Sequence, residues 1–168
     1  MRPAEEFRYL VLAAQREGNR LLGQALRPLG ITTSQAEVIS ILHERQPLTL
    51  TGLGELLVCE SGSSPSRLVD RLVAAGLIHR NPAEHDRRHI DLRLTDSGEQ
   101  LAAQIIQIEE QLYQRIDALA EGTGLDQINT FLRAFVRDLP AGQAIIRRTT
   151  PAAHGRLTGR SFRSRTRS

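Results

Sequence analysis

The fold is decided by the stretch SPSRLVDRLVAAGLIHRNPAEHDRRHIDLRLT, residues 64–95, in which a helix pattern passes into a strand pattern. The helix starts at Ser64-Pro65, an N-cap followed by proline at the first helical position, and Gly76 ends it. The side chains that it buries are Leu68, Val69, Leu72 and Val73. From Ile90 to Leu94 apolar and polar residues alternate, which is typical of a half-buried strand. The stretch therefore predicts a helix followed by a β-hairpin.

The sequence on both sides of this stretch predicts further helices. The first ends at Pro28 and Gly30, and the second begins at a candidate capping box, Ser34 to Glu37. The chain from Pro140 onward is rich in Arg, Ser, Thr and Gly, and we expect it to be irregular. In order, the expected elements are helices at 4–27, from Ser34 toward Pro47, at 51–58 and at 65–75, a hairpin at 77–94, and helices at 96–121 and 125–139.

Two helices joined by a tight turn and followed by a two-stranded hairpin form a winged helix-turn-helix. The expected fold class is mainly α with a small β-hairpin wing. The terminal helices are too apolar to remain solvated around so small a centre, and a dimer that interleaves them explains the sequence best. The expected domains are an N-terminal dimerisation helix (1–30), a winged helix-turn-helix domain (31–96), C-terminal dimerisation helices (97–140) and an Arg-rich flexible tail (141–168).

Composition limits the compartment and the class of protein. No apolar run approaches the roughly 18 residues that span a bilayer, and the opening MRPAEEFRYL is not a secretory signal. A single cysteine, Cys59, excludes an internal disulfide and fits a reducing environment. We therefore expect a cytoplasmic protein that has no membrane partner.

The positive charge is concentrated at the C-terminus. All 22 basic residues are arginines, and the net charge is +3. Seven of these arginines and none of the 19 acids follow residue 138, so residues 1–138 carry a net charge of −4. A nucleic-acid interface in the folded part must therefore be argued from where its arginines lie. The tail has two interpretations, a basic arm that adds sequence-independent DNA affinity or a segment with no selected role, and the first is modestly favoured.

The exposed face of helix 65–75 carries residue types that bind DNA. The outward residues are Ser66, Arg67, Asp70, Arg71 and Ala74, with Ser63 and Ser64 at the tip. Small hydroxyl residues at a helix N-terminus allow a phosphate to approach, and Arg67 is long enough to reach a guanine edge in the major groove. The alternative is a solvated face with a salt bridge between Asp70 and an arginine. Asp70 is structural in both cases, because a carboxylate would repel phosphate.

The predicted hairpin places Arg87 and Arg88 at its turn. When a recognition helix lies in the major groove, a neighbouring hairpin lies at the height of the adjacent minor groove, which an arginine can enter. Asp86 fits a supporting role, pairing with an arginine and capping the turn. The candidate metal ligands nearby are His85, His89 and Asp91. A structural or phosphate-contacting role is favoured for the histidines, and neither a metal nor a cofactor is expected.

These motifs resemble the MarR family of winged-helix transcriptional regulators over about residues 5–139. The residues that carry the resemblance are Ser66–Leu72, Gly76-Leu77-Ile78, Asp86-Arg87-Arg88 and Leu94–Gly98. The resemblance implies a homodimer on a roughly palindromic operator, usually a repressor released by a small molecule or by oxidation. It also implies that Arg88 reads the minor groove and that Asp86 braces the wing through a salt bridge.

The chain departs from the family pattern in one place. The turn at 58–63 is slightly longer than is usual, and Pro65 replaces a more typical aliphatic or polar residue. This departure leaves open which of Ser63, Ser64 and Ser66 meets the bases.

Two kinds of regulatory site are considered. The resemblance implies an effector pocket between the winged domain and the dimer helices, where Arg16, Arg20, His43 and Arg45 could meet an anionic aromatic molecule. Solvation, or pairing with nearby glutamates, is the favoured interpretation of these residues. Cys59 is a candidate for redox sensing, but its place at a helix C-terminus beside an acid disfavours the thiolate, so a partly buried structural thiol is favoured.

The predicted function is sequence-specific binding of double-stranded DNA by a homodimeric transcriptional regulator, most often a repressor. No nucleophile–base pair, phosphate loop or paired-carboxylate motif is present, so we expect no enzyme. The rival hypothesis is a winged-helix protein-interaction module without operator binding, which the net charge of −4 over residues 1–138 supports. Across residues 61–93 there are six arginines and four acids, which favours DNA.

Overall fold

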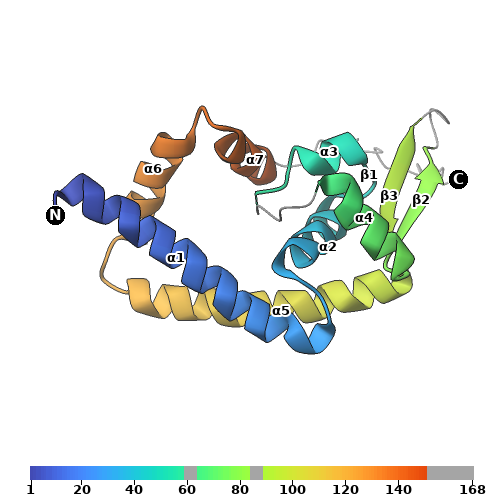
Figure 1. Cartoon of the computed structure of the whole chain (residues 1–168), viewed down its shortest axis with the longest axis horizontal. Helices are drawn as coiled ribbons and strands as arrows, with labels where there is room; N and C mark the ends of the chain where they lie inside the picture. The colour runs from blue at the N-terminus through green and yellow to red at the C-terminus, as the bar shows by residue number, and fades with distance from the viewer. Residues whose placement is uncertain (59–63, 84–88, 151–168) are drawn as a thin grey trace, which may run out of the picture.

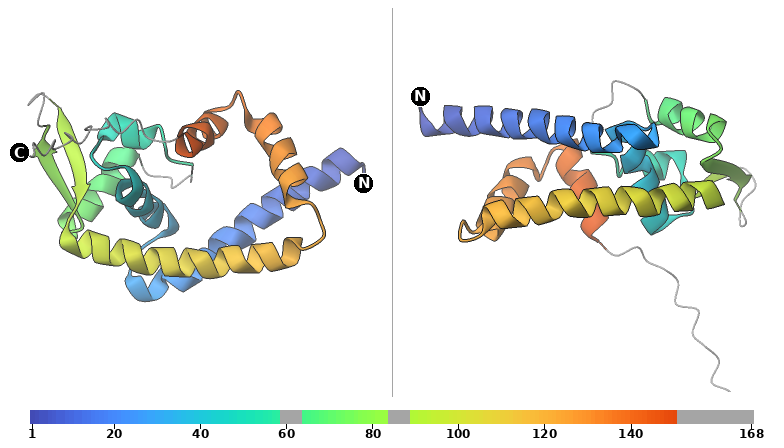
Figure 2. Two further views of the ribbon diagram at one scale, coloured as in Figure 1. Left: turned by 180° about the vertical axis from the view of Figure 1, so that it is seen from behind. Right: turned by 90° about the horizontal axis from the view of Figure 1, so that it is seen from below.

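The computed structural model describes residues 1–58, 64–83 and 89–150. Its elements are α1 (Pro3–Leu26), the 3-10 turn η1 (Arg27–Leu29), α2 (Thr33–Arg45), β1 (Leu48–Thr49), α3 (Leu50–Gly54), α4 (Pro65–Ala74), β2 (Ile78–Pro82), β3 (Ile90–Leu94), α5 (Asp96–Ala120), α6 (Leu125–Val136) and α7 (Pro140–Thr149). In Figure 1, α2, α3, α4 and the sheet form a lobe at one end, from which α1 and α5 extend. The views in Figure 2 show α6 and α7 returning from the far end of α5 toward this lobe.

The hydrophobic core lies in the lobe and against the first half of α5. Its largest fully buried side chains include Ile39, Leu42, Leu53, Val69, Leu72, Ile78, Leu92 and Ile105. Burying one such side chain stabilises the fold by about 1.5–3 kcal/mol. By contrast, α1 buries only Leu26, and no residue of α6, all of which is described, is buried. None of the helices in the described ranges is both long and apolar enough to cross a lipid bilayer.

Three short strands form the wing sheet in the order β1-β3-β2, and both pairings are antiparallel. The sequence predicted only the β2–β3 hairpin. The third strand pairs Leu48 with Leu92, because the chain between α2 and α3 runs extended beside β3. Leu92 and Leu94 are 1% and 8% exposed and face the core, whereas Ile90 is 47% exposed. The alternation in β3 therefore sets which face of the sheet packs on the helices.

The capping box of α2 is not at the predicted position. Thr32 is the N-cap, since its hydroxyl accepts a hydrogen bond from the Gln35 amide while its own amide donates to the Gln35 side chain at 2.9 Å. Ser34 and Glu37 lie inside the helix and are buried. The capping-box pattern fits both pairs in the sequence. Only the tertiary contacts of Glu37 distinguish them.

The sequence predicted an irregular chain from Pro140 onward. That prediction is wrong as far as Thr149, because Pro140–Thr149 form the helix α7. This helix packs against α6 so closely that a Cβ on Gly142 would overlap the carbonyl oxygen of Val136. Ala144 is also buried against the rest of the chain. Small residues make these contacts, so hydropathy gave little sign of the helix. The predicted tail beyond it, residues 151–168, lies outside the described residues.

Candidate nucleic-acid interface

The first turn of α4 is open to solvent. Ser64 has the extended backbone of an N-cap, but its side chain makes no capping hydrogen bond to the described residues of the helix. Its Oγ instead lies 2.9 Å from the Oγ of Ser66. Within the described ranges this turn has no side-chain cap, and the positive end of the helix dipole attracts anions.

Two arginines lie on the polar face of the same helix. The side chains of Arg67 and Arg71 are exposed, and neither forms a hydrogen bond or an ion pair with the described part of the chain. The opposite face of α4 is held in the core by Leu68 and Leu72. Guanidinium groups that no carboxylate of their own chain holds can pair with phosphate or with a base edge.

An ion pair joins this helix to the wing. Arg80 of β2 donates from Nη2 to Oδ1 of Asp70 on α4 at 2.5 Å. In the sequence analysis a salt bridge between Asp70 and an arginine belonged to the alternative, a solvated helix face; the structure forms such a pair, with the partner on β2. Both side chains are exposed, so the pair contributes only about 0.2–1 kcal/mol to stability. It joins α4 to the hairpin by a direct contact between two side chains.

The described part of the hairpin ends beside its predicted turn. Pro82 lies opposite Ile90, and the amide of Ala83 donates to the carbonyl of His89 at 2.9 Å. His89 is exposed at this end of β3. The predicted turn residues Asp86, Arg87 and Arg88 lie outside the described residues, and the same holds for His85, Ser63 and Cys59. The two strands therefore bring the ends of segment 84–88 together at the far end of the wing.

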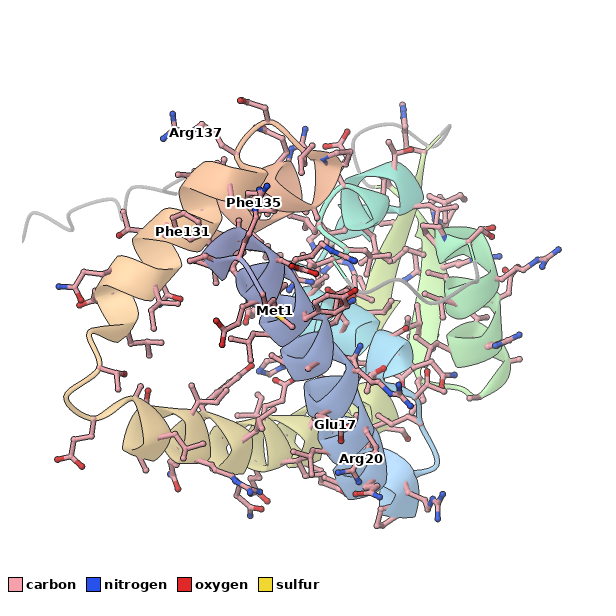
Figure 3. All side chains as sticks on the ribbon, turned by 60° about the vertical axis from the view of Figure 1, so that its left-hand side comes forward. Met1, Glu17, Arg20, Phe131, Phe135 and Arg137 are labelled. Carbon is pink, nitrogen blue, oxygen red and sulfur yellow. The ribbon has the colours of Figure 1, made fainter. Side chains whose placement is uncertain are left out.

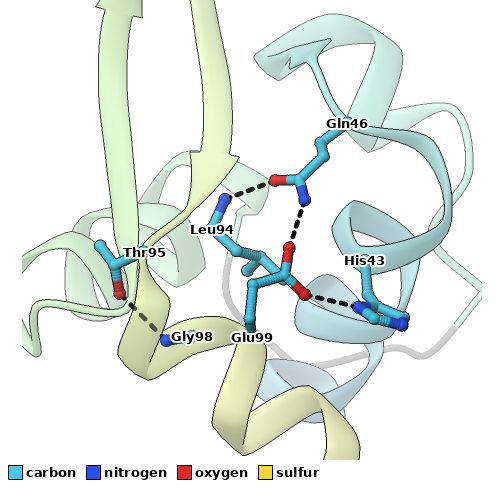
Figure 4. A network of polar contacts seen from close by, with 6 residues as sticks. All are labelled: His43, Gln46, Leu94, Thr95, Gly98 and Glu99. Atoms are coloured by element: carbon cyan, nitrogen blue, oxygen red, sulfur yellow. Dashed lines mark hydrogen bonds and ion pairs between the residues drawn. The ribbon is translucent and has the colours of Figure 1, made fainter.

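A polar network fixes the base of the wing on α2 and α5 (Figure 4). The side-chain oxygen of Gln46 accepts from the amide of Leu94 at 2.7 Å, and its Nε2 donates to Oε1 of Glu99 at 2.5 Å. The other carboxylate oxygen of Glu99 lies 2.6 Å from Nδ1 of His43. The hydrogen bond from His43, assisted by Gln46, lowers the pKa of Glu99, although desolvation opposes the shift. Sequence reasoning missed Gln46 and Glu99, since neither belongs to a local motif.

Thr95 ties the end of β3 to the end of α4. Its hydroxyl accepts from the Gly98 amide at 3.0 Å, capping α5, and donates to the carbonyl of Gly76 at 2.7 Å. A Cβ on Gly98 would overlap the carbonyl oxygen of Leu77, so the helix approaches the start of β2 closely. The run Leu94–Gly98 thus sets the junction between the wing and the long helix.

The residues considered for an effector pocket are not joined by any contact between described residues. Arg20 pairs with Glu17 at 2.6 Å on the outside of α1, as Figure 3 shows, and this pair lowers the pKa of Glu17. His43 is held by Glu99 on α5. The favoured interpretation, pairing with nearby glutamates, is therefore confirmed for Arg20 and His43. Arg16 is exposed on α1.

The predictions on metals and redox chemistry concern residues near the wing and the α3–α4 turn. Within the described ranges, no three His, Cys, Asp or Glu side chains are grouped so that they could hold a metal ion. His89 and Asp91 are described, whereas His85 is not. Because Cys59 also lies outside the described ranges, its redox role stays a prediction.

Comparison with known proteins agrees with this geometry. The family model described as the MarR family matches residues 31–90. The multiple antibiotic resistance protein MarR of Escherichia coli (strain K12) is 29% identical over 132 residues, which are 78% of this chain and 89% of that protein. The organic hydroperoxide resistance transcriptional regulator of Bacillus subtilis (strain 168) is 31% identical over 100 residues, which are 60% of this chain and 67% of that regulator.

A solved structure extends the likeness to the fold. The crystal structure of a cysteine-to-serine mutant of MarR from E. coli, complexed with operator DNA, matches with a TM-score of 0.63 and 28% identity. The match covers 79% of this chain and 92% of that one. It therefore includes more than the lobe that holds α4 and the wing.

Proposed function

Since the chain belongs to the MarR family and is a DNA-binding transcriptional regulator, we propose that it acts as a homodimeric repressor on a roughly palindromic operator. The observation that carries the proposal is the solvent-facing side of α4. There, among the residues that the structure describes, a first turn without a side-chain cap lies together with two arginines that form no ion pair, beside a wing that Arg80 joins to the helix. Such a surface offers a phosphate site and a base-reading side chain next to each other.

In this proposal α4 enters the major groove. The first-turn amides beside Ser64 and Ser66 receive a backbone phosphate, and Ser63 precedes them in the chain. Arg67 reaches a base edge, where a bidentate pair with guanine discriminates by about 1–3 kcal/mol. Arg71 lies one turn further along the exposed face and contacts the backbone.

The wing enters the adjacent minor groove in the same proposal. The antiparallel pairing of β2 and β3 supports this assignment, since the described residues on either side of segment 84–88, Ala83 and His89, meet at the end of the hairpin. Arg88 is the expected minor-groove reader, with Arg87 and His89 beside it, and Asp86 braces the turn. A narrow minor groove has the strongest negative potential, which favours an arginine there.

The apolar surfaces outside the lobe support the homodimer. The exposed apolar residues of α1, α5 and α6 include Leu10, Leu12, Ile116, Leu119, Ile128, Phe131 and Phe135. Phe131 and Phe135 of α6 lie beside the first turns of α1 (Figure 3), with ring centroids 5.1 and 6.1 Å from that of Phe7. They line an apolar groove of about 720 Å³. A second copy of the chain would cover these apolar faces, which lie in the segments predicted to dimerise, residues 1–30 and 97–140.

Release by a small aromatic or anionic effector belongs to the same proposal and rests on family membership. The expected pocket lies between the winged domain and the dimer helices. Since Arg20 and His43 are each held by a carboxylate, binding of an anion there would have to displace Glu17 or Glu99.

The test is selection of bound duplexes from random DNA, followed by affinity measurements on the recovered site. A homodimer should recover an inverted repeat, with log affinity falling against log salt by about 0.9 per phosphate neutralised. Arg88→Ala should weaken specific binding severely while the fold and the dimer stay intact. Unchanged affinity would show that the wing assignment is wrong, and failure to recover any duplex would favour the rival, a protein-interaction module.

A further inference from the structure

Two arginines of the C-terminal helix α7 pair with the helix-turn-helix, and Arg148 is the more buried of the two. The Nη2 of Arg148 donates to Oε1 of Glu37 on α2, and its Nε donates to the carbonyl of Leu56 at 2.8 Å. The Glu37 side chain is 8% exposed and that of Arg148 is 31% exposed, so the carboxylate is buried and the guanidinium half-buried. Arg45 of α2 holds the end of α7 in place by donating to the carbonyls of Arg148 and Thr150.

The same contacts fix the chain that leaves α3. The carboxylate oxygen that Arg148 binds also accepts from the amide of Val58 at 2.8 Å. Leu56 and Val58 are among the last described residues before the segment that leads into α4. Upstream of them, a Cβ on Gly54 would lie 3.6 Å from the ring of Pro65, the first residue of α4. Arg148 therefore contacts, directly or through Glu37, the chain that leaves α3, and α3 itself lies close to the first residue of α4.

Arg148 also acts on a charged group of α5. Burial and Glu44 raise the pKa of Glu109, while Arg148 lowers it. A buried carboxylate that loses a cationic partner destabilises its surroundings. Loss of Arg148 would therefore disturb Glu37 and, with it, the segment that Glu37 holds.

We propose that Arg148 is a positioning residue for DNA recognition, by which α7 latches the end of α3 and sets how α4 meets the duplex. The inference rests on the proposed DNA-binding function and adds a determinant outside the winged domain. It also removes Arg148 from the arginines that could form a basic arm, because its guanidinium is held by the fold. Arg147 on the same helix differs, since its ion pair with Glu55 is long, at 3.7 Å, and exposed.

Arg148→Ala and Arg147→Ala in the full chain form a matched pair, each removing one positive charge from α7. If Arg148 positions α4 in this way, Arg148→Ala should bind the selected operator about tenfold more weakly, close to the loss of one base contact. The slope of log affinity against log salt should stay unchanged. Arg147→Ala should bind nearly as the parent chain does. If both variants lose affinity equally and each lowers the slope by about 0.9, α7 acts as a basic arm and the latch is refuted.

Hydrogen exchange of the Val58 amide tests the latch without DNA. Its protection should fall in Arg148→Ala and persist in Arg147→Ala, and unchanged protection in both would overturn the proposal. If the parent chain binds no selected duplex, the proposed function is wrong. The protection of the Val58 amide would still show whether Arg148 holds the chain that leaves α3.

A second pair covers the case in which Arg148→Ala does not fold. Glu37→Gln alone keeps the bond from Arg148 to Leu56, while Glu37→Gln with Arg148→Met removes that bond and both charges of the pair. The double variant should bind the operator about tenfold more weakly than Glu37→Gln. Equal affinities of these two chains would contradict a positioning role for Arg148.

Discussion

Arg67 projects from the first turn of α4 into solvent, within reach of a base edge once the helix lies in the major groove. Arg67→Ala should lower discrimination at one base pair of the operator by about 1–3 kcal/mol while changing binding to unrelated DNA little. Competition between operators that differ at single positions measures this loss. Arg27→Ala, which removes an exposed arginine outside the proposed interface, is the control. A uniform loss over all operator variants would instead make Arg67 a phosphate contact.

At the scale of elements, local pattern predicted most of the fold. Periodicity located α1, α2, α4 and α5, and alternation located β2 and β3. It missed α7 and the pairing of β1 because these depend on contacts with distant segments and carry little apolar pattern of their own. The face of α4 followed from its helical spacing. The ion pairs of Arg80 with Asp70 and of Arg148 with Glu37 could not be predicted, since ion pairs between distant segments have no fixed spacing in the sequence.

The junction between β2 and α5 makes a prediction about glycine. Gly98→Ala should destabilise the fold by roughly 2–4 kcal/mol, because the added methyl group would overlap the backbone of Leu77. Gly18→Ala is its matched control: no atom lies within 4 Å of the added Cβ, so it should stabilise α1 by about 0.5–1 kcal/mol. Urea unfolding of both variants measures these changes. Equal effects would show that the close approach at Gly98 is not tight.

The network at the base of the wing makes a prediction about pH. Because the folded state lowers the pKa of Glu99, its contribution is present above the ordinary glutamate pKa of about 4.3 and is lost as the pH falls through the folded value. Glu99→Gln should therefore be less stable than the parent chain at neutral pH, by at most about 1 kcal/mol since the pair is partly exposed. The difference should shrink in acid. Urea unfolding across the acidic range checks this, with Glu121→Gln as the control, and a difference that grows toward low pH would contradict the assignment.

At the scale of the whole molecule, the chain divides its apolar residues between two uses. Those of the lobe form a closed core together with Leu26 of α1, whereas many of those on the rest of α1, on the second half of α5 and on α6 remain on the surface. Figure 1 shows α6, the start of α1 and the second half of α5 at the end of the molecule away from the wing. A partner subunit that covers these apolar surfaces therefore leaves α4 and the hairpin uncovered. A twofold axis through the contact would present α4 and the hairpin of both subunits to one duplex.

Phe135 tests most directly whether the exposed apolar residues of α6 form a subunit contact. Its side chain is 64% exposed, although its ring meets that of Phe7 edge to face. Phe135→Asp should shift the chain from dimer to monomer in sedimentation analysis, because a carboxylate cannot be buried in an apolar contact without a partner. Leu50→Asp places the same charge on α3, outside the three helices, and should leave the dimer intact. Operator affinity should fall with the dimer, as one half-site then binds alone. A Phe135→Asp chain that stays dimeric would move the subunit contact away from α6.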